Sequence, residues 1–554
     1  MATLSIFLAM VALIAGMVGC VPVEYELTIA STAGGKVDPP GEGTFTHNEG
    51  TVVYLIADAE EGYRFVWWEG DVDTIGNMTD FSTHIKVTGN YAIKAKFEEI
   101  PEYDLTISST EGGSVKTPGE GTITRDGGTV VSLVAGREYG YGFVNWTGDV
   151  GTIDDVEDAE TTITMKGNYE ITANFEEEQA VTFADLDLKA AIKASPDIPE
   201  QPEIYPSDLE RLTSLHAEQW NVSDLTGLEH CTSLERLYLK DNQIDDLSTL
   251  ADLTGLTDLS IGGNQISGVP PLANLKRLTE LNLSNNQISD ISSLANLTGL
   301  TELFLEGNNI SDISSLANLT ELRYLYLGSN NISDISPLAK LTELKYLYLG
   351  SNNISDISPL AKLTELTNLR LERNQISDIS SLANLTRLTN LRLEHNQISD
   401  ILSLAELTRL TYLYLWHNQI SDISSLANLT RLTHLSLERN QINDISPLEK
   451  LTRLTHLSLE HNQISDISPL EKLTSLRDLS LVDNQISDIS PLEKLTSLRD
   501  LFLVSNQISD IGPLVNNPGL SQGDELYLWN NPLSPSSIST YIPQLKARDV
   551  IVHY

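Results

Sequence analysis

Leucine and isoleucine recur at fixed positions along more than half of the chain, in a frame that repeats every 22 residues. One copy of the frame places apolar side chains at Leu366, Leu369, Leu371, Ile376, Ile379, Leu382 and Leu385. Two leucines at i and i+2 mark a short strand with one buried face, because side chains alternate along a strand. A fixed period of this length indicates a solenoid, in which each repeat supplies one turn of the molecule.

Two polar residue types keep their places within this frame. Asparagine stands at every 22nd residue from Asn242 to Asn506, and again at Asn531 after an insertion. Its side chain can donate and accept, so it can satisfy turn backbone groups that stacking would leave unpaired. An aspartate such as Asp378 follows in most turns, and we expect it to cap the next tight turn. A calcium ladder of these aspartates is the weaker alternative, because each turn offers a single carboxylate.

The frame resembles the leucine-rich repeat of the 22-residue class found in bacterial internalins. This resemblance implies an α/β-type leucine-rich-repeat solenoid, with a parallel β-sheet on its concave face and short 3-10 turns on its convex face. About 14 repeats are expected over residues 212–531. Because the first turn of a solenoid would otherwise expose its core, residues 179–211 are interpreted as an N-terminal cap. The tail of the chain resembles the closing repeat and C-terminal cap of bacterial repeat proteins, so residues 532–554 are expected to form that cap.

The sequence also predicts a helix before the repeats and the position of one cysteine. In the N-terminal cap, residues 183–194 predict a helix whose apolar side carries Phe183, Leu186, Ala190 and Ile192. Cys231 takes a position where the next repeat has a leucine, so it is expected to be a small core residue.

Shorter alternations of apolar and polar residues precede the solenoid in two matching copies. The segment YELTIASTAGGKVDPPGEGTF from Tyr25 matches YDLTISSTEGGSVKTPGEGTI from Tyr103, and the offset of 78 holds through each copy. The segments are rich in Val, Ile, Thr and aromatic residues and are separated by turn residues, so they predict strands. Residues 21–99 and 100–178 are therefore expected to form two small all-β modules. They resemble the β repeat modules found beside leucine-rich repeats in internalin-type surface proteins.

A tryptophan recurs at the same place in each module. Trp68 corresponds to Trp146, and each follows a tyrosine and a phenylalanine in the pattern G-Y-x-F-x-x-W. The pair could present a platform for carbohydrate or form the cores of the two modules. The core interpretation is favoured, because the modules hold few other large apolar residues.

The first residues of the chain have a composition of their own. The apolar run Leu4–Val18 is too short for a comfortable membrane span, but it is long enough for the centre of a signal peptide. The run ends at Gly19-Cys20 and resembles the lipobox of bacterial lipoproteins, in which the cysteine is acylated after cleavage. Residues 1–20 are thus predicted to be a signal peptide, and the protein to be exported and anchored to the bacterial membrane through a lipid on Cys20. A plain signal peptide or an uncleaved anchor is the alternative.

Composition and motifs exclude several classes of function. A net charge of -42 and a pI near 4.4 argue against nucleic acid as a partner, because phosphate binding needs a basic surface. Two cysteines provide neither a disulfide framework nor a zinc site. We find no nucleophile elbow, no H-E-x-x-H and no phosphate-binding loop, so we expect neither an enzyme nor a cofactor.

Large polar and aromatic side chains cluster on the expected concave face. The residues beside and between the strand leucines should point away from the core, and they can be followed from repeat to repeat. The resulting block consists of Phe304, Tyr324, Tyr326, Tyr346, Tyr348, Arg370, Arg392, His395, Tyr412, Tyr414, Trp416, His417, His434, Arg439, His456 and His461. An exposed patch of this kind usually marks a binding surface, and Tyr, Trp and Arg are enriched at interface hot spots.

The same block of side chains also has other interpretations. Tyrosine and histidine also favour strands and stack on their equivalents in adjacent repeats, so the block could be stacking alone. The histidines could make the surface sensitive to pH, whereas metal binding between them is the weaker alternative.

The sequence therefore predicts a binding protein at the cell surface. We expect recognition of a protein or glycan through the concave face, with an adhesin as the specific case, by a protein that is itself a monomer. No membrane contact other than the N-terminal lipid is expected. The alternative is a structural cell-envelope protein whose repeats mediate self-assembly or spacing, which the acidity of the solenoid disfavours.

Overall fold

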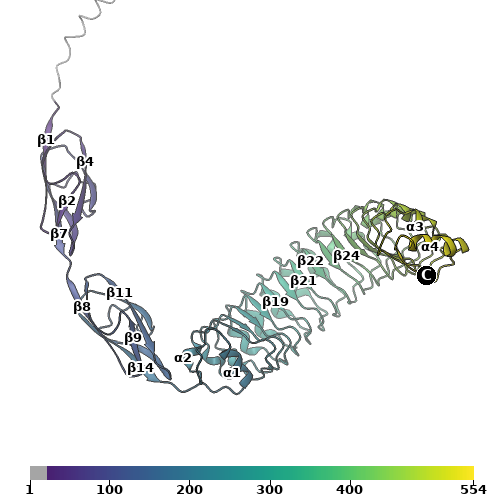
Figure 1. Cartoon of the computed structure of the whole chain (residues 1–554), viewed down its shortest axis with the longest axis horizontal. Helices are drawn as coiled ribbons and strands as arrows, with labels where there is room; N and C mark the ends of the chain where they lie inside the picture. The colour runs from purple at the N-terminus through teal and green to yellow at the C-terminus, as the bar shows by residue number, and fades with distance from the viewer. Residues whose placement is uncertain (1–21) are drawn as a thin grey trace, which may run out of the picture. The chain divides into compact units, whose positions relative to one another are not determined.

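The computed structural model describes residues 22–554, which form two compact units that meet between Gln179 and Ala180 (Figure 1). The predicted signal peptide and Cys20 lie outside the described residues. The first unit contains the two expected β modules, and the second contains the solenoid.

The first module is built from two small sheets. A four-stranded sheet has the order β3-β1-β7-β5, with β1 and β7 parallel, and a three-stranded sheet has the order β2-β4-β6. The strands are β1 Glu24–Ser31, β2 Gly35–Val37, β3 Gly43–Asn48, β4 Val52–Ala59, β5 Tyr63–Gly70, β6 Ser82–Lys86 and β7 Tyr91–Glu99. Alternate residues of these strands are buried, as the sequence pattern predicts.

The second module repeats this arrangement strand for strand. Its sheets have the orders β10-β8-β14-β12 and β13-β11-β9. The strands are β8 Glu102–Ser109, β9 Gly113–Thr117, β10 Gly121–Asp126, β11 Val130–Arg137, β12 Tyr141–Gly148, β13 Glu160–Thr164 and β14 Tyr169–Glu177.

The paired tryptophans form the cores of the two modules. Trp68 is 0% exposed and Trp146 is 1% exposed. The indole Nε1 of Trp68 donates to the carbonyl of Asp80 at 3.0 Å, and Trp146 makes the equivalent bond at 3.1 Å. The core interpretation is confirmed, and a carbohydrate platform made of this pair is excluded.

Two short helices, α1 (Leu186–Lys193) and α2 (Pro206–Leu209), precede the solenoid sheet. The Asp185 carboxylate caps α1 by accepting from the backbone N–H groups of residues 187 and 188. The helix buries Leu188, Ala191 and Ile192 at the 3–4 residue spacing of one helical face. The predicted apolar side was therefore partly wrong. Leu186 opens the helix and is 75% exposed, Ala190 is exposed as well, and Phe183 is buried ahead of the helix.

The second unit is dominated by one parallel sheet in which each repeat adds one strand (Figure 1). Strand centres pair in register, so that Leu347, Leu369 and Leu391 are neighbours. The strands are β15 Ser214–His216, β16 Arg236–Tyr238, β17 Asp258–Ser260, β18 Glu280–Asn282, β19 Glu302–Phe304, β20 Tyr324–Tyr326, β21 Tyr346–Tyr348, β22 Asn368–Arg370, β23 Asn390–Arg392, β24 Tyr412–Tyr414, β25 His434–Ser436, β26 His456–Ser458, β27 Asp478–Ser480, β28 Asp500–Phe502, β29 Glu525–Tyr527 and β30 Ile551–His553.

The opposite side of the solenoid carries 3-10 helices and ends in short helical turns. The 3-10 helices are η1 Leu228–His230, η2 Ser248–Leu250, η3 Pro270–Asn274, η4 Ser292–Asn296, η5 Ser314–Asn318, η6 Ser336–Lys340, η7 Ser358–Lys362, η8 Ser380–Asn384, η9 Leu402–Leu404, η10 Ser424–Asn428, η11 Ser446–Lys450, η12 Ser468–Lys472 and η13 Ser490–Lys494. The C-terminal end contains α3 Gly512–Asn516, the π-helical turn η14 Ser537–Tyr541 and α4 Ile542–Lys546. The predicted fold class is confirmed.

The sheet has sixteen strands, two more than the asparagine frame predicts. Strand β15 precedes the first asparagine and has Trp220 in its place, whereas β30 lies in the last residues of the chain. Strand pairing needs only backbone groups, so these end strands extend the sheet without the full side-chain frame.

The repeated asparagine joins each turn to the one before it. Asn374 Nδ2 donates to the carbonyls of Leu349 at 3.0 Å and Leu371 at 3.1 Å, and its Oδ1 accepts from the Ile354 N–H at 3.0 Å. The Asp378 carboxylate accepts from the Ser380 N–H at 2.8 Å and so caps η8. Both predicted roles are confirmed.

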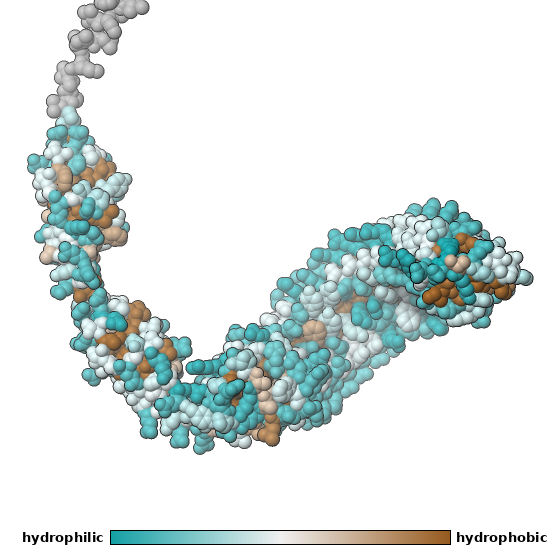
Figure 2. Space-filling model, viewed as in Figure 1, coloured by the Kyte–Doolittle hydropathy of each residue, from teal (hydrophilic) through white to brown (hydrophobic). Residues whose placement is uncertain are grey.

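The leucines and isoleucines of the frame form one continuous core along the solenoid. Most of the solenoid surface visible in the space-filling view is accordingly hydrophilic, with apolar patches between (Figure 2). Cys231 is fully buried in this core, as predicted, and burial raises the pKa of its thiol to about 12.

Candidate functional site

Four columns of side chains run along the strand side of the solenoid, one residue per repeat. The first column opens each strand and includes Tyr324, Tyr346, Asn368, Asn390, Tyr412, His434 and His456. The second closes each strand and includes Phe304, Tyr326, Tyr348, Arg370, Arg392 and Tyr414. The third lies two residues later, with Trp416 and a series of glutamates. The turn column directly precedes each asparagine and includes Arg373, His395, His417, Arg439 and His461.

Rings of the first column stack on their neighbours in adjacent repeats. The ring centroids of Tyr324 and Tyr346 lie 5.0 Å apart. Those of Tyr412 and His434 lie 4.6 Å apart, and those of His434 and His456 lie 4.1 Å apart. The spacing follows from the sheet itself, because neighbouring strands are separated by about 4.8 Å.

The second column is a nearly continuous stack of planar groups. Phe304 stacks on Tyr326 with a centroid distance of 4.7 Å. The Arg370 guanidinium lies 4.3 Å from the centre of the Tyr348 ring, and that of Arg392 lies 4.6 Å from the ring of Tyr414. Such contacts between a cation and an aromatic face are favourable and orient both partners.

Two glycines leave room for one of these rings. A Cβ atom added to Gly328 would lie 2.3 Å from the Tyr348 ring, and one added to Gly350 would lie 2.5 Å from it. Both distances are far below a normal contact. The third column is therefore left empty at these two repeats, and Tyr348 lies across it.

Residues of the turn column adopt the left-handed backbone conformation. The φ angles of His395, His417, Arg439 and His461 lie between 51° and 56°. His395 contacts the Trp416 ring edge-on with a centroid distance of 4.2 Å, and it also lies 4.4 Å from the His417 ring. His461 Nδ1 is 2.6 Å from the Asp483 carboxylate. Side chains of the turn column therefore contact one another and the aromatic side chains of the sheet.

Two glutamates that the sequence prediction left out neutralise the arginines. Arg370 Nη2 lies 2.7 Å from Glu372 Oε1, and Arg392 Nη1 lies 3.7 Å from Glu394 Oε1. Both glutamates are 6% exposed, and burial raises the pKa of Glu394. Each follows its arginine by two residues in a strand-like stretch, so the alternation of side chains could have placed both on the same face.

The sixteen predicted binding residues thus lie together on one face, but most are less exposed than expected. Tyr412, at 37%, is exposed together with His417 and Arg439, and the other thirteen are half-buried against one another. Stacking explains how these side chains are held. Whether they bind a partner stays a prediction.

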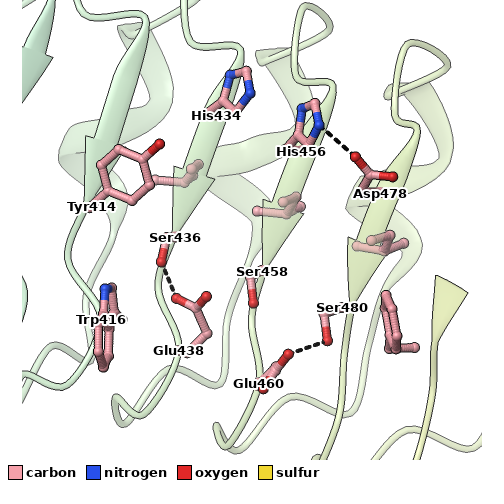
Figure 3. Close-up of a pocket in the computed structure, with 14 residues that line it drawn as sticks. Tyr414, Trp416, His434, Ser436, Glu438, His456, Ser458, Glu460, Asp478 and Ser480 are labelled. Atoms are coloured by element: carbon pink, nitrogen blue, oxygen red, sulfur yellow. Dashed lines mark hydrogen bonds and ion pairs between the residues drawn. The ribbon is translucent and has the colours of Figure 1, made fainter. Parts of the chain in front are cut away.

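An open hollow of about 440 Å³ interrupts the second column beyond Tyr414. Its floor carries three serines from consecutive strands, Ser436, Ser458 and Ser480 (Figure 3). His434, His456 and Asp478 line one edge, and Glu438 and Glu460 line the other (Figure 3). Tyr414 and Trp416 bound one end, and Phe502 of β28 also belongs to the lining. The sequence prediction did not single out this hollow, although the run of small residues in one column marks it.

Acidification should charge His434 only below the ordinary range of histidine. Burial, followed by the neighbouring His456, lowers the pKa of His434 from 6.5, and Asp478 opposes this only in part. A lowered folded-state pKa means that the unfolded chain binds the proton first. The contribution of His434 to stability is therefore complete above about pH 6.5 and falls as the pH drops toward its folded-state pKa.

NMR titration of the histidine ring signals measures this directly. We expect a His434 midpoint below that of free histidine, and a partial rise toward it in the His456→Gln variant. A midpoint at or above the ordinary value would contradict the prediction.

No group of three or more His, Cys, Asp or Glu side chains in residues 22–554 is placed to hold a metal ion. No helix within this range has the length and apolar character needed to cross a membrane.

The fold and the columned concave face define a leucine-rich-repeat solenoid protein with two N-terminal β modules. Matches to family profiles agree with this class. A profile described as "Divergent InlB B-repeat domain" matches residues 25–101 and 103–179. "Leucine Rich repeats (2 copies)" matches overlapping segments between residues 254 and 516, and "Leucine Rich repeat" matches 230–248. No curated protein gave a match.

Solved structures identify the family. The chain is 42% identical to an internalin (inlF) from Listeria monocytogenes over 59% of its own length and 96% of that protein, with a TM-score of 0.57. It therefore belongs to the internalin family of leucine-rich-repeat proteins. The Leptospira interrogans leucine-rich-repeat protein LIC12759 shares the fold at 23% identity, covering 63% of this chain and 97% of that one, with a TM-score of 0.56. The plant peptide hormone receptor RGFR1, solved in complex with RGF2, shares it at 24% identity, with 60% and 62% covered and a TM-score of 0.52.

Proposed function

We propose that this protein binds a protein or glycan partner at the bacterial cell surface through the concave face of its solenoid, and acts as an adhesin. The observation that carries the proposal is the ordered block of stacked Tyr, Trp, His and Arg side chains across consecutive strands. Rings held in place by their neighbours lose little conformational freedom on binding, which is the property of an interface anchor. The family membership supports a binding role rather than catalysis.

The location of the protein is part of the same proposal. Residues 1–20 direct export, and Cys20 carries the lipid that holds the protein at the membrane. The two β modules then stand between the anchor and the solenoid in the sequence, as spacers. The support for this location is the resemblance of the N-terminus to a lipobox.

The test compares partner capture by the parent chain and by a variant with Tyr348, Tyr414 and Trp416 changed to alanine. Both are applied to a glycan array and to cell-surface extracts, and captured proteins are identified by mass spectrometry and measured again in purified form. Each hot-spot side chain contributes about 2 kcal/mol or more, so we expect affinity to fall by more than about 100-fold.

The matched control changes Lys340, Lys362 and Leu402, which are exposed on the 3-10 helices of the opposite side, to alanine. This variant should bind like the parent, and both variants should keep the parent's circular dichroism spectrum. Equal capture by the parent and the Tyr348, Tyr414 and Trp416 variant would reject the concave face as the binding site. Concentration-dependent assembly of the parent that persists in that variant, without any partner, would favour the structural alternative.

A further inference from the structure

The hollow beyond Tyr414 exists because the second column changes character there. From Phe304 to Tyr414 this column carries a large planar side chain in every repeat, and at Phe502 a ring returns. The three repeats between have serine at this place. Strands β24 and β28 are four steps apart, so the two ring-bearing strands are separated by about 19 Å. The strands between them are regular, and Leu435 and Leu479 are buried beneath the serines.

The lining of the hollow is acidic and aromatic. Its fourteen residues include Glu438, Glu460 and Asp478 but no lysine or arginine. Ser436 donates to the Glu438 carboxylate, and the Ser480 hydroxyl donates to Glu460 Oε1 at 2.7 Å (Figure 3). His456 Nε2 lies 2.5 Å from the Asp478 carboxylate, so this acid has a partner among the lining residues.

The two glutamates differ from those beside the arginines. Glu372 and Glu394 each have an arginine two residues earlier, whereas Glu438 and Glu460 have serines at that place, and the side chains that bond to them are serine hydroxyls. Burial raises the pKa of Glu438, because its charged form is poorly solvated. A cation that enters the hollow would supply the counter-charge that arginines provide in the preceding repeats.

The aromatic side chains favour an organic cation over a metal ion. Tyr414 and Trp416 close one end of the hollow, and Glu438 is the nearer of the two glutamates that follow along its edge (Figure 3). A guanidinium or ammonium group gains from carboxylates and from aromatic faces together, and Arg392 already contacts Tyr414 in this way from the preceding repeat. The net charge of -42 also attracts cationic partners over longer distances.

We propose that the hollow in front of Ser436, Ser458 and Ser480 is a subsite for a lysine or arginine side chain of a protein partner. The proposal deepens the proposed function and rests on it, because it names the chemistry that one part of the concave face selects. A neutral saccharide would use the aromatic side chains but would leave the two glutamate carboxylates without a counter-charge.

The test measures binding of a small molecule at the subsite, so it needs no macromolecular partner. The full chain contains six tryptophans, and Trp416 lines the hollow. With 5-fluorotryptophan incorporated, each tryptophan gives a separate ¹⁹F NMR signal. The signal that is missing in the Trp416→Phe variant belongs to Trp416. The probe is N-acetyl-arginine N-methylamide at about 0.15 M salt, which screens long-range attraction. Its neutral analogue, N-acetyl-citrulline N-methylamide, and diacetylchitobiose are titrated in parallel.

The expected result is a saturable shift of the Trp416 signal by the arginine probe, with a Kd on the order of millimolar. The citrulline analogue should bind at least about tenfold more weakly. The double variant Glu438→Gln and Glu460→Gln should lose the response to arginine. The double variant Glu321→Gln and Glu343→Gln removes the same charge from exposed positions elsewhere and should keep it.

Three outcomes would overturn the subsite. They are no Trp416 shift with arginine, an equal response to arginine and citrulline, and a response to diacetylchitobiose alone, which would indicate a glycan site instead. None of these depends on partner capture. If they occur while the Tyr348, Tyr414 and Trp416 variant still loses its partner, the subsite fails and the proposed function stands.

Discussion

Replacing Trp68 with alanine should strongly destabilise the first β module and leave the solenoid folded. The indole is 0% exposed and contacts Phe65, with ring centroids 5.6 Å apart. Removing a buried tryptophan costs about 3–5 kcal/mol, because its contacts are lost and a cavity remains. A domain as small as residues 22–99 is stable by only about 4–12 kcal/mol. The substitution therefore removes between about a quarter and all of that stability, and calorimetry should show the first-module transition at a clearly lower temperature or lost.

The neighbouring tryptophan provides the control for this experiment. Trp67 is 40% exposed, so Trp67→Ala should change the free energy of unfolding by about 1 kcal/mol or less. The solenoid transition should be the same in both variants, since the solenoid is a separate compact unit. An unchanged first-module transition in Trp68→Ala would show that the indole is not the centre of that core.

Replacing Asn374 with alanine should destabilise the solenoid at one seam between turns. The change leaves the buried Ile354 N–H without its partner. The carbonyls of Leu349 and Leu371 each lose one of two donors and keep only Asn352 and Asn396. A buried polar group left unpaired costs about 1–3 kcal/mol, and each hydrogen bond lost at a carbonyl that keeps another donor costs about 0.5–1.5 kcal/mol, so a total loss of about 2–4 kcal/mol is expected. The denaturation midpoint should fall, and the Ile354 amide should exchange with solvent faster than in the parent.

The matched variant for this seam is Asn353→Ala. Asn353 is exposed and one repeat away, so its substitution should shift the free energy of unfolding by no more than about 0.5 kcal/mol. If Asn374→Ala had the same midpoint as the parent and an equally protected Ile354 amide, the asparagine contacts would not hold the seam.

The regular part of the fold could be predicted because the 22-residue pattern of leucine and isoleucine determines it. Leucines such as Leu369 and Leu371, two residues apart, determine which side of each strand is buried, and the period determines that the strands pair in register. The asparagine and aspartate roles followed from the hydrogen bonds that each side chain can make. At the ends of the solenoid the pattern fades, and this is where the strand number and the buried face of α1 were misjudged.

The candidate site could be predicted only as a set of columns. The sequence places Tyr348 and Arg370 on the same face, but it does not contain the distance between them or the empty space beside Gly328. A hollow arises where large side chains are missing, and small residues give no signal of their own in the sequence. Ser436 and Ser458 therefore did not predict the hollow, although they shape the face as much as Tyr414 does.

The identical seams between turns set how this binding face can change over generations. Residues 325–344 and 347–366 have the same sequence, as a recent duplication of one unit would leave them. Gain or loss of a whole unit within the gene rebuilds every seam with the same asparagine contacts. Such an event between Tyr414 and Phe502 would lengthen or shorten the hollow by one strand spacing, about 4.8 Å. Unequal recombination can thus alter the reach of the site in fixed steps, whereas single substitutions alter only its chemistry.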